Sequence, residues 1–164
     1  MTPELHRPVA VSQIGPAGLD VTVEASPEEC EALALRMDLP AVVSLTCAFR
    51  LERDAASNML AHGRLTARVV QVCVVSLEEF AAPLEERFTV RCVAEGTESE
   101  DADPNALDEI TYVNGVLDLG EATAEQLALA LDPYPRAPGA ELPDTTSEPD
   151  DLPFASLAAR RQRH

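Results

Sequence analysis

The chain has 164 residues but no lysine and no tryptophan, and it contains only two Tyr and four Phe. Without lysine, the sequence excludes Schiff-base catalysis, a lysine general base and the Gly-x-x-x-x-Gly-Lys loop that binds nucleotide phosphates. With so few rings, a platform of aromatic side chains that stacks on nucleic-acid bases is not expected. The composition therefore excludes lysine-dependent catalysis and the lysine-containing phosphate loop, and it argues against nucleic-acid binding by aromatic stacking.

Cysteine and histidine are too few and too far apart for the common metal and redox motifs. The cysteines are Cys30, Cys47, Cys73 and Cys92, and the histidines are His6, His62 and His164. They include no Cys-x-x-Cys pair and no ligand-spaced histidines, so the sequence predicts no metal site and no cofactor. We expect reduced, buried thiols. A nucleophilic Cys73 would need His62 as its base, and no third group is indicated.

The net charge of −17 constrains the partners of the protein. Twelve arginines face 29 acidic residues. Nucleic-acid affinity depends on cations that replace phosphate counterions, so bare RNA is expected to repel such a chain at long range. The predicted direct partner is a basic protein. Acidic residues concentrate at 95–109 and 141–151. The rest of the chain is only mildly acidic, so it can still carry a local basic surface.

The length predicts one domain with its own core. We place that domain at residues 1–140, with a mobile acidic insertion at about 95–109. Residues 141–164 are expected to form an acidic linker and a short basic C-terminal tail, which contains Arg160, Arg161 and Arg163. No apolar run approaches the roughly 20 residues that span a bilayer, and no signal-peptide pattern is present, so we expect a cytoplasmic protein with no membrane partner.

Apolar and polar residues alternate in several segments, which is typical of half-buried strands. The predicted strands cover residues 19–25, 41–52, 59–75, 84–92 and 113–119. Within the third, Val70 to Val75 are nearly all apolar, which predicts burial on both faces. Capping-box patterns at Ser26 and Thr123 predict helices at 27–38 and 124–131. We expect an α+β fold, in which two or three short helices pack on a twisted antiparallel sheet of about five or six strands that curls toward a barrel.

Arginines lie on the polar faces of three predicted strands. They are Arg50, Arg64, Arg68, Arg87 and Arg91. If the strands are neighbours, these side chains form a patch that could bind RNA phosphate or an acidic protein segment. The alternative is cross-strand pairing with Glu52, Glu85 or Glu86.

A proline-rich segment, Asp132-Pro133-Tyr134-Pro135-Arg136, is a second candidate interface. Tyr134 and Arg136 are residue types enriched at the energetic centres of protein interfaces, and two prolines stiffen the chain around them. The alternative is a rigid cap over the sheet edge with Tyr134 buried.

Two segments together resemble one bacterial family. The first runs from Gly63 to Glu78 with Gln71, Cys73 and Leu77 at its centre, and the second is Leu127-Ala128-Leu129-Ala130-Leu131 followed by Pro133 and Pro135. They are similar to the signatures of the YceD family, the large ribosomal RNA subunit accumulation proteins, in its alpha-proteobacterial form. We expect these signature residues, Glu78 included, to be structural, with Cys73 as a small core side chain and Gln71 as a satisfied buried amide. The alternative is that Gln71 and Cys73 order the turn that exposes Leu77 and Glu78.

The resemblance further implies a non-enzymatic factor in ribosome biogenesis, so the basic partner would be a ribosomal or RNA-processing protein. Two alternatives belong to other classes. One is a module that binds precursor rRNA directly, which the arginine patch would serve. The other is a small hydrolase or nuclease, which would need a pocket with a titratable pair of strongly shifted pKa values. The oligomeric state is not indicated.

Overall fold

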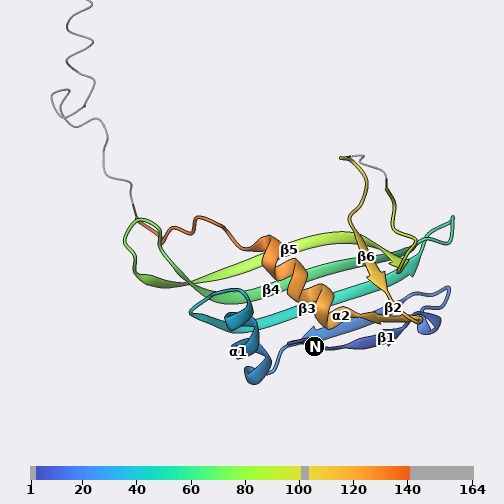
Figure 1. Cartoon of the computed structure of the whole chain (residues 1–164), viewed down its shortest axis with the longest axis horizontal. Helices are drawn as coiled ribbons and strands as arrows, with labels where there is room; N and C mark the ends of the chain where they lie inside the picture. Colours follow the sequence, from blue (N-terminus) through green and yellow to red (C-terminus); the bar gives the residue numbers. More distant parts are fainter. Residues whose placement is uncertain (1–2, 101–103, 141–164) are drawn as a thin grey trace, which may run out of the picture.

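The computed structural model describes residues 3–100 and 104–140 (Figure 1). Within these residues the chain forms seven strands, two α-helices and one 3-10 helix. In chain order they are β1 (Pro8–Ala10), the 3-10 helix (Val11–Gln13), β2 (Leu19–Glu24), α1 (Pro27–Arg36), β3 (Ala41–Arg53), β4 (Met59–Val72), β5 (Glu79–Ala94), β6 (Glu109–Tyr112), β7 (Val116–Asp118) and α2 (Leu119–Ala130). The predicted α+β class is confirmed.

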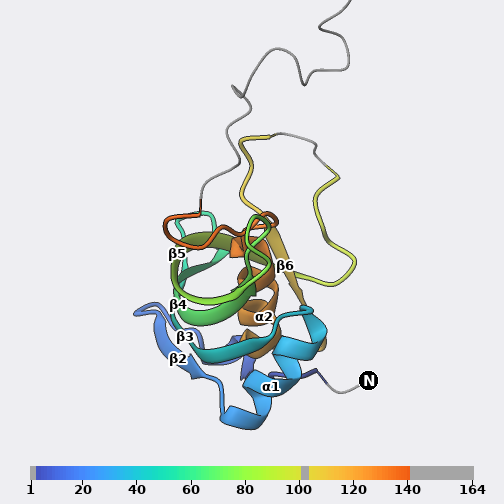
Figure 2. The same cartoon turned by 90° about the vertical axis from the view of Figure 1, so that its left-hand side faces the viewer.

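The main sheet has five strands in the order β2-β3-β4-β5-β6, and β1 pairs with β7 in a separate two-stranded sheet. Strands β2 to β5 are antiparallel neighbours, whereas β6 runs parallel to the end of β5, with Arg91 opposite Glu109. A parallel pair needs a long crossover, which residues 95–108 supply. The sheet curves but does not close into a barrel (Figure 2).

Helix α1 begins as its sequence predicts. The Ser26 hydroxyl accepts a hydrogen bond from the Glu29 amide at 3.2 Å, and the Glu29 carboxylate accepts one from the Ser26 amide at 2.7 Å. This reciprocal capping box satisfies backbone donors that the first turn leaves free. The helix ends at Arg36, two residues earlier than predicted, and Asp38 adopts a left-handed conformation with φ 54°.

The predicted start of the second helix at residues 123–124 is wrong. Helix α2 begins at Leu119, because the Asp118 carboxylate accepts hydrogen bonds from the amides of Gly120 and Glu121. Thr123 instead lies inside the helix, where its hydroxyl donates to the Leu119 carbonyl at 2.7 Å. A Cβ on Gly120 would lie 2.5 Å from the Leu5 carbonyl oxygen, so the close approach of the N-terminal segment requires glycine here.

One hydrophobic core joins the concave face of the sheet to both helices (Figure 2). Its fully buried side chains include Leu5, Leu33, Leu45, Leu51, Leu65, Leu117, Leu119 and Leu127. All four cysteines are free and buried, as predicted. Both helices bury residues in this core, so the opposite face of the sheet, here called the outer face, carries the polar residues of β3, β4 and β5.

Candidate functional site

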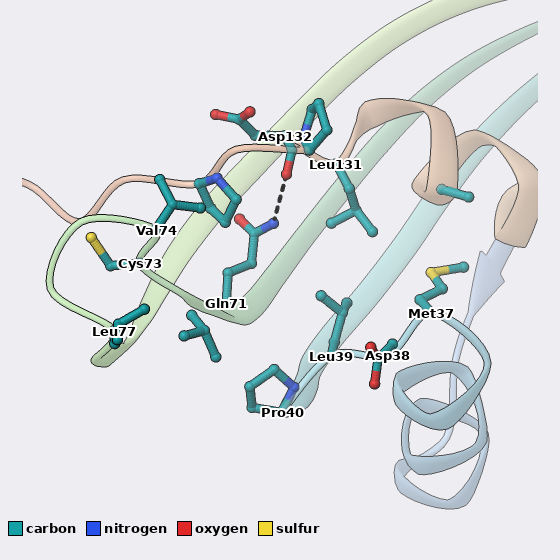
Figure 3. Close-up of a pocket in the computed structure, with 14 residues that line it drawn as sticks. Met37, Asp38, Leu39, Pro40, Gln71, Cys73, Val74, Leu77, Leu131 and Asp132 are labelled. Carbon is teal, nitrogen blue, oxygen red and sulfur yellow. Dashed lines mark hydrogen bonds between the residues drawn. The ribbon is translucent and has the colours of Figure 1, made fainter.

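The turn after β4 and the segment after α2 lie against one another, although some 60 residues separate them in the sequence (Figure 3). The Val74 amide donates a hydrogen bond to the Pro135 carbonyl at 2.9 Å. The Gln71 side-chain amide donates to the Asp132 carbonyl at 3.3 Å. Gln71 is only 8% exposed, so this bond satisfies a donor that has little access to water. The fold therefore brings the two signature segments together.

Cys73 stands at the centre of this junction. Its sulfur accepts hydrogen bonds from the Ala137 amide at 3.3 Å and the Ser76 amide at 3.4 Å, and its side chain has no exposed surface. The Ala137 amide is the largest influence, followed by Ser76, and together they lower the thiol pKa to about 6. Hydrogen bonds to the thiolate stabilise it in this way. A thiolate here would hold the two segments together.

His62 is not placed to act as a base for Cys73. Its Nδ1 contacts the Thr89 hydroxyl at 3.0 Å, and its Nε2 contacts Glu52 at 2.8 Å on the outer face. Cys73 follows the last residue of β4, whereas His62 lies near the first. The Cys–His arrangement of a thiol enzyme is therefore not formed by this pair.

A groove of about 540 Å³ lies beside the junction, between the end of α1, the β4–β5 turn and the segment after α2 (Figure 3). Apolar side chains dominate its lining, and several are open to solvent: Leu77 is 76% exposed and Val74 is 45% exposed. Asp38 and Asp132 also line it. Val72, at the end of β4, is 42% exposed. Burial of Val70 to Val75 on both faces is thus a wrong prediction, because alternate residues of this run point toward solvent.

Gly63, another signature residue, accommodates an aromatic ring. It lies opposite Phe88 in the β4–β5 pair, and a Cβ on it would stand 2.1 Å from Cζ of that ring. Phe49, opposite Gly63 on the other side, packs against the same ring edge to face with centroids 5.8 Å apart. Glycine is required here because Phe88 occupies the space of a side chain.

The five candidate arginines lie on the outer face, as the strand pattern predicts. Three of them form ion pairs: Arg50 with Asp20 at 3.1 Å, Arg64 with Glu85 at 2.9 Å, and Arg91 with Glu109. The alternative was cross-strand pairing with Glu52, Glu85 or Glu86. Among the described residues, Glu85 is the one of these three that pairs with an arginine. Glu52 contacts His62 instead, and Glu86 lies opposite Leu65.

Arg68 and Arg87 form no ion pair within residues 3–100 and 104–140. Arg87 lies directly opposite Arg64 across the β4–β5 pair, and both side chains are exposed. Arg50, Arg64 and Arg87 border a shallow hollow of about 480 Å³ on the outer face. The positive charges that have no ion-pair partner among the described residues, those of Arg68 and Arg87, therefore lie on the neighbouring strands β4 and β5.

The Pro133–Pro135 segment exposes its central ring. Tyr134 is 73% exposed, so the alternative in which Tyr134 is buried is wrong, and Arg136 is exposed as well. The Tyr134 amide donates to the Asp132 side chain at 2.9 Å, which turns the chain locally. Tyr134 and Arg136 are therefore available to a partner at the same end of the molecule as the groove.

Among the residues of the groove, sequence reasoning missed Asp38 and Leu39, whereas Val74 and Asp132 belong to segments that it had singled out. Pro40 indicates that the first helix ends before it. The sequence pattern does not show that this end lies beside the β4–β5 turn, because that position depends on tertiary packing. In the part of the chain that the structure describes, no group of three or more His, Cys, Asp or Glu side chains could hold a metal ion. None of the described helices is long and apolar enough to cross a membrane.

Comparison with known proteins addresses the same residues. A family model described as large ribosomal RNA subunit accumulation protein YceD matches residues 61–156. No curated protein and no solved structure matches the chain. The match begins in β4 and includes Gly63, the β4–β5 turn and the proline segment that packs on it. It covers more than half of the sequence, and the chain therefore belongs to the YceD family, the large ribosomal RNA subunit accumulation proteins.

Proposed function

We propose that the protein supports accumulation of large-subunit ribosomal RNA in the cytoplasm as a non-enzymatic factor, and that it does so by binding a basic ribosomal or RNA-processing protein. Family membership supports the ribosomal role. The net charge of −17 is the observation that favours a basic protein as the direct partner. Complementary charge accelerates association and disfavours partners of the wrong sign, here RNA phosphate.

The ribosomal role is tested in a strain depleted of the protein. We expect the ratio of large to small subunits to fall together with large-subunit rRNA, and the wild-type gene to restore both. A ratio that stays unchanged on depletion would contradict the proposal. Small-subunit rRNA, measured in the same samples, is the internal control for a general decline in growth.

The nature of the partner is tested with two separated pools. The purified full-length protein is mixed with RNA-free large-subunit ribosomal proteins and, separately, with protein-free large-subunit rRNA. Binding to one basic protein with little binding to rRNA supports the proposal. The reverse pattern would replace the protein partner with direct RNA contact.

Direct contact with precursor rRNA is the second candidate, and the arrangement of Arg64, Arg68 and Arg87 on the outer face favours it. The side chains of Arg68 and Arg87 have no ion pair among the described residues. If this face binds RNA, changing both Arg68 and Arg87 to Gln should weaken binding. The slope of the logarithm of the binding constant against the logarithm of salt concentration should become shallower by about two, because about two phosphate contacts are lost. Arg53→Gln, a change of one charge at the far end of β3, is the control.

A further inference from the structure

We infer that the groove between the end of α1, the β4–β5 turn and the segment after α2 is the docking site for a basic amphipathic segment of the partner protein. The inference rests on the proposed function, because it assigns a surface to the basic partner proposed there. Its support comes from apolar exposure, backbone conformation and charge around the groove.

The groove exposes apolar surface at one end of the molecule. Leu77 is 76% exposed, and Val72 and Val74 are 42% and 45% exposed. Together with Leu39, Pro133 and Pro135 they line a single hollow of about 540 Å³. Isolated apolar residues on a surface are ordinary, but several that line one concavity are typical of a site that another chain covers.

The backbone holds Leu77 in an unfavourable conformation that keeps its side chain outside the core. Its φ is 62°, in the left-handed region that leucine rarely adopts. Two hydrogen bonds between Cys73 and the far end of the turn fix this conformation: the Leu77 amide donates to the Cys73 carbonyl at 2.9 Å, and the Cys73 amide to the Glu78 carbonyl at 2.9 Å. Strain that surrounding structure maintains often accompanies binding sites.

The charge of the groove selects the occupant. Among the described residues that line it, Asp38 and Asp132 are acidic and none is basic. Glu78 and Glu79, which follow Leu77, are exposed, as is Arg136, which follows Pro135, so acidic side chains outnumber basic ones around the groove. A second copy of this acidic chain would bring like charge to the rim, and RNA phosphate would be repelled in the same way. A segment with apolar side chains on one face and arginine or lysine on the other satisfies both the lining and the rim.

Peptide binding to the full-length protein tests the inference. The probe is a fluorescein-labelled helix of about four turns with leucine on one face and arginine on the other, measured by anisotropy. One control peptide has glutamate in place of arginine, and the other has the same composition in an order without an apolar face. We expect the leucine–arginine peptide to bind and the two controls to bind far more weakly.

Two variants locate the site. Leu77→Ser should weaken binding about tenfold, because the exposed leucine loses its apolar contact with the peptide. Leu107→Ser is the matched control: Leu107 is 47% exposed and belongs to the hollow beside Asn58 and Leu60, near the opposite end of β4. The affinity of the Leu107→Ser variant for the peptide should match that of the wild-type protein. Both positions are exposed, so neither variant is expected to unfold.

A second pair of variants tests the charge. Asp38→Asn combined with Asp132→Asn should weaken binding and reduce its salt dependence, and asparagine tolerates the left-handed backbone of Asp38. Glu31→Gln combined with Glu95→Gln removes the same charge away from the groove and should have little effect. Equal losses in both pairs would mean that only the overall charge attracts the peptide, and the docking site would then be wrong.

Other results would overturn the inference. Wild-type affinity in Leu77→Ser, or equal binding of the glutamate peptide, would exclude a basic amphipathic ligand in this groove. If Phe154→Ala with Leu157→Ala raises peptide affinity, the chain's own C-terminal residues compete for the groove, and they become its occupant. Failure of any peptide to bind while the gene still restores large subunits removes the groove site alone. If the wild-type gene does not restore large subunits in the depleted strain, the proposed function itself is wrong.

Discussion

The amide of Val74 donates a hydrogen bond to the carbonyl of Pro135, so the turn that ends β4 is fixed to the segment that follows α2. The bond joins two walls of the groove directly. Gln71 and Cys73 make further bonds to the same segment, at the Asp132 carbonyl and the Ala137 amide. The shape of the groove therefore depends on a small polar junction and not on the core alone.

Changing Gln71 to Met should loosen this junction. The substitution keeps a side chain of similar length but removes the donor to the Asp132 carbonyl, for an expected loss of about 1 kcal/mol in unfolding free energy. The Val74 amide should exchange with deuterium faster than in the wild type. The Ala25 amide, bonded to the Leu45 carbonyl in another part of the sheet, is the control and should keep its rate. Unchanged exchange at Val74 would show that Gln71 does not hold the segment.

Gly63→Ala should destabilise the protein by about 1–3 kcal/mol, because the new methyl group would overlap the Phe88 ring. Urea denaturation measures the effect. Gly15→Ala is the matched control, since a Cβ added there would have no heavy atom within 4 Å and no positive φ constrains the residue. The cost of Gly63→Ala should also shrink in a Phe88→Leu background, and equal costs in both backgrounds would contradict the overlap.

Stability should rise with pH across the range in which Cys73 ionises. Amide hydrogen bonds lower the pKa of its thiol to about 6 from an ordinary 9.0. Between these values the unfolded chain binds more protons than the folded one, so the free energy of unfolding increases as pH rises through this range. The gain is lost as pH falls through about 6. In Cys73→Ser the slope between pH 6 and 9 should be smaller, and an equal slope would exclude Cys73 as its source.

Acid should weaken the start of α1 through Glu29. The Arg7 guanidinium, with the Ser26 amide and hydroxyl, lowers the pKa of Glu29 to about 2 from an ordinary 4.5. The folded carboxylate is therefore retained where the unfolded one is protonated, so this contribution to stability is present above pH 4.5 and is lost as pH falls toward 2. Glu29→Gln should cost about 1 kcal/mol at neutral pH and flatten the acid limb. Glu28→Gln, one position earlier, is the matched control for the loss of one negative charge in the first turn of α1.

The sequence predicts the parts of this fold that short-range patterns specify. Strands β2 and β3 have clear alternation, and the Ser26–Glu29 capping box lies entirely within four residues. Strands β6 and β7 are four and three residues long. β6 pairs with β5 only after a crossover, and β7 pairs with β1, from which most of the other elements separate it in sequence. Such short strands depend on tertiary pairing, which local patterns do not record.

The groove was predictable only in part for the same reason. Leu77, Asp132, Pro133 and Pro135 belong to segments that stood out in the sequence, but Asp38 and Leu39 reach the groove from the segment after α1, which did not. The apolar run from Val70 to Val75 is compatible with burial on either or both faces, so its exposed residues could not be identified. The start of α2 was misplaced because the pattern at Thr123 matches a capping box, whereas the cap is Asp118 and Thr123 lies inside the helix.

The pairing of β1 with β7 has a consequence for synthesis on the ribosome. Leu5 is buried in the same core as Leu127, which is translated 122 residues later. At typical rates of 5–20 residues per second, the interval between them is about 6 to 24 s. The β2–β5 meander emerges earlier and joins strands that are near in sequence, with little loop-closure entropy. The N-terminal strand must therefore wait, without its partner, until nearly the whole domain has been made.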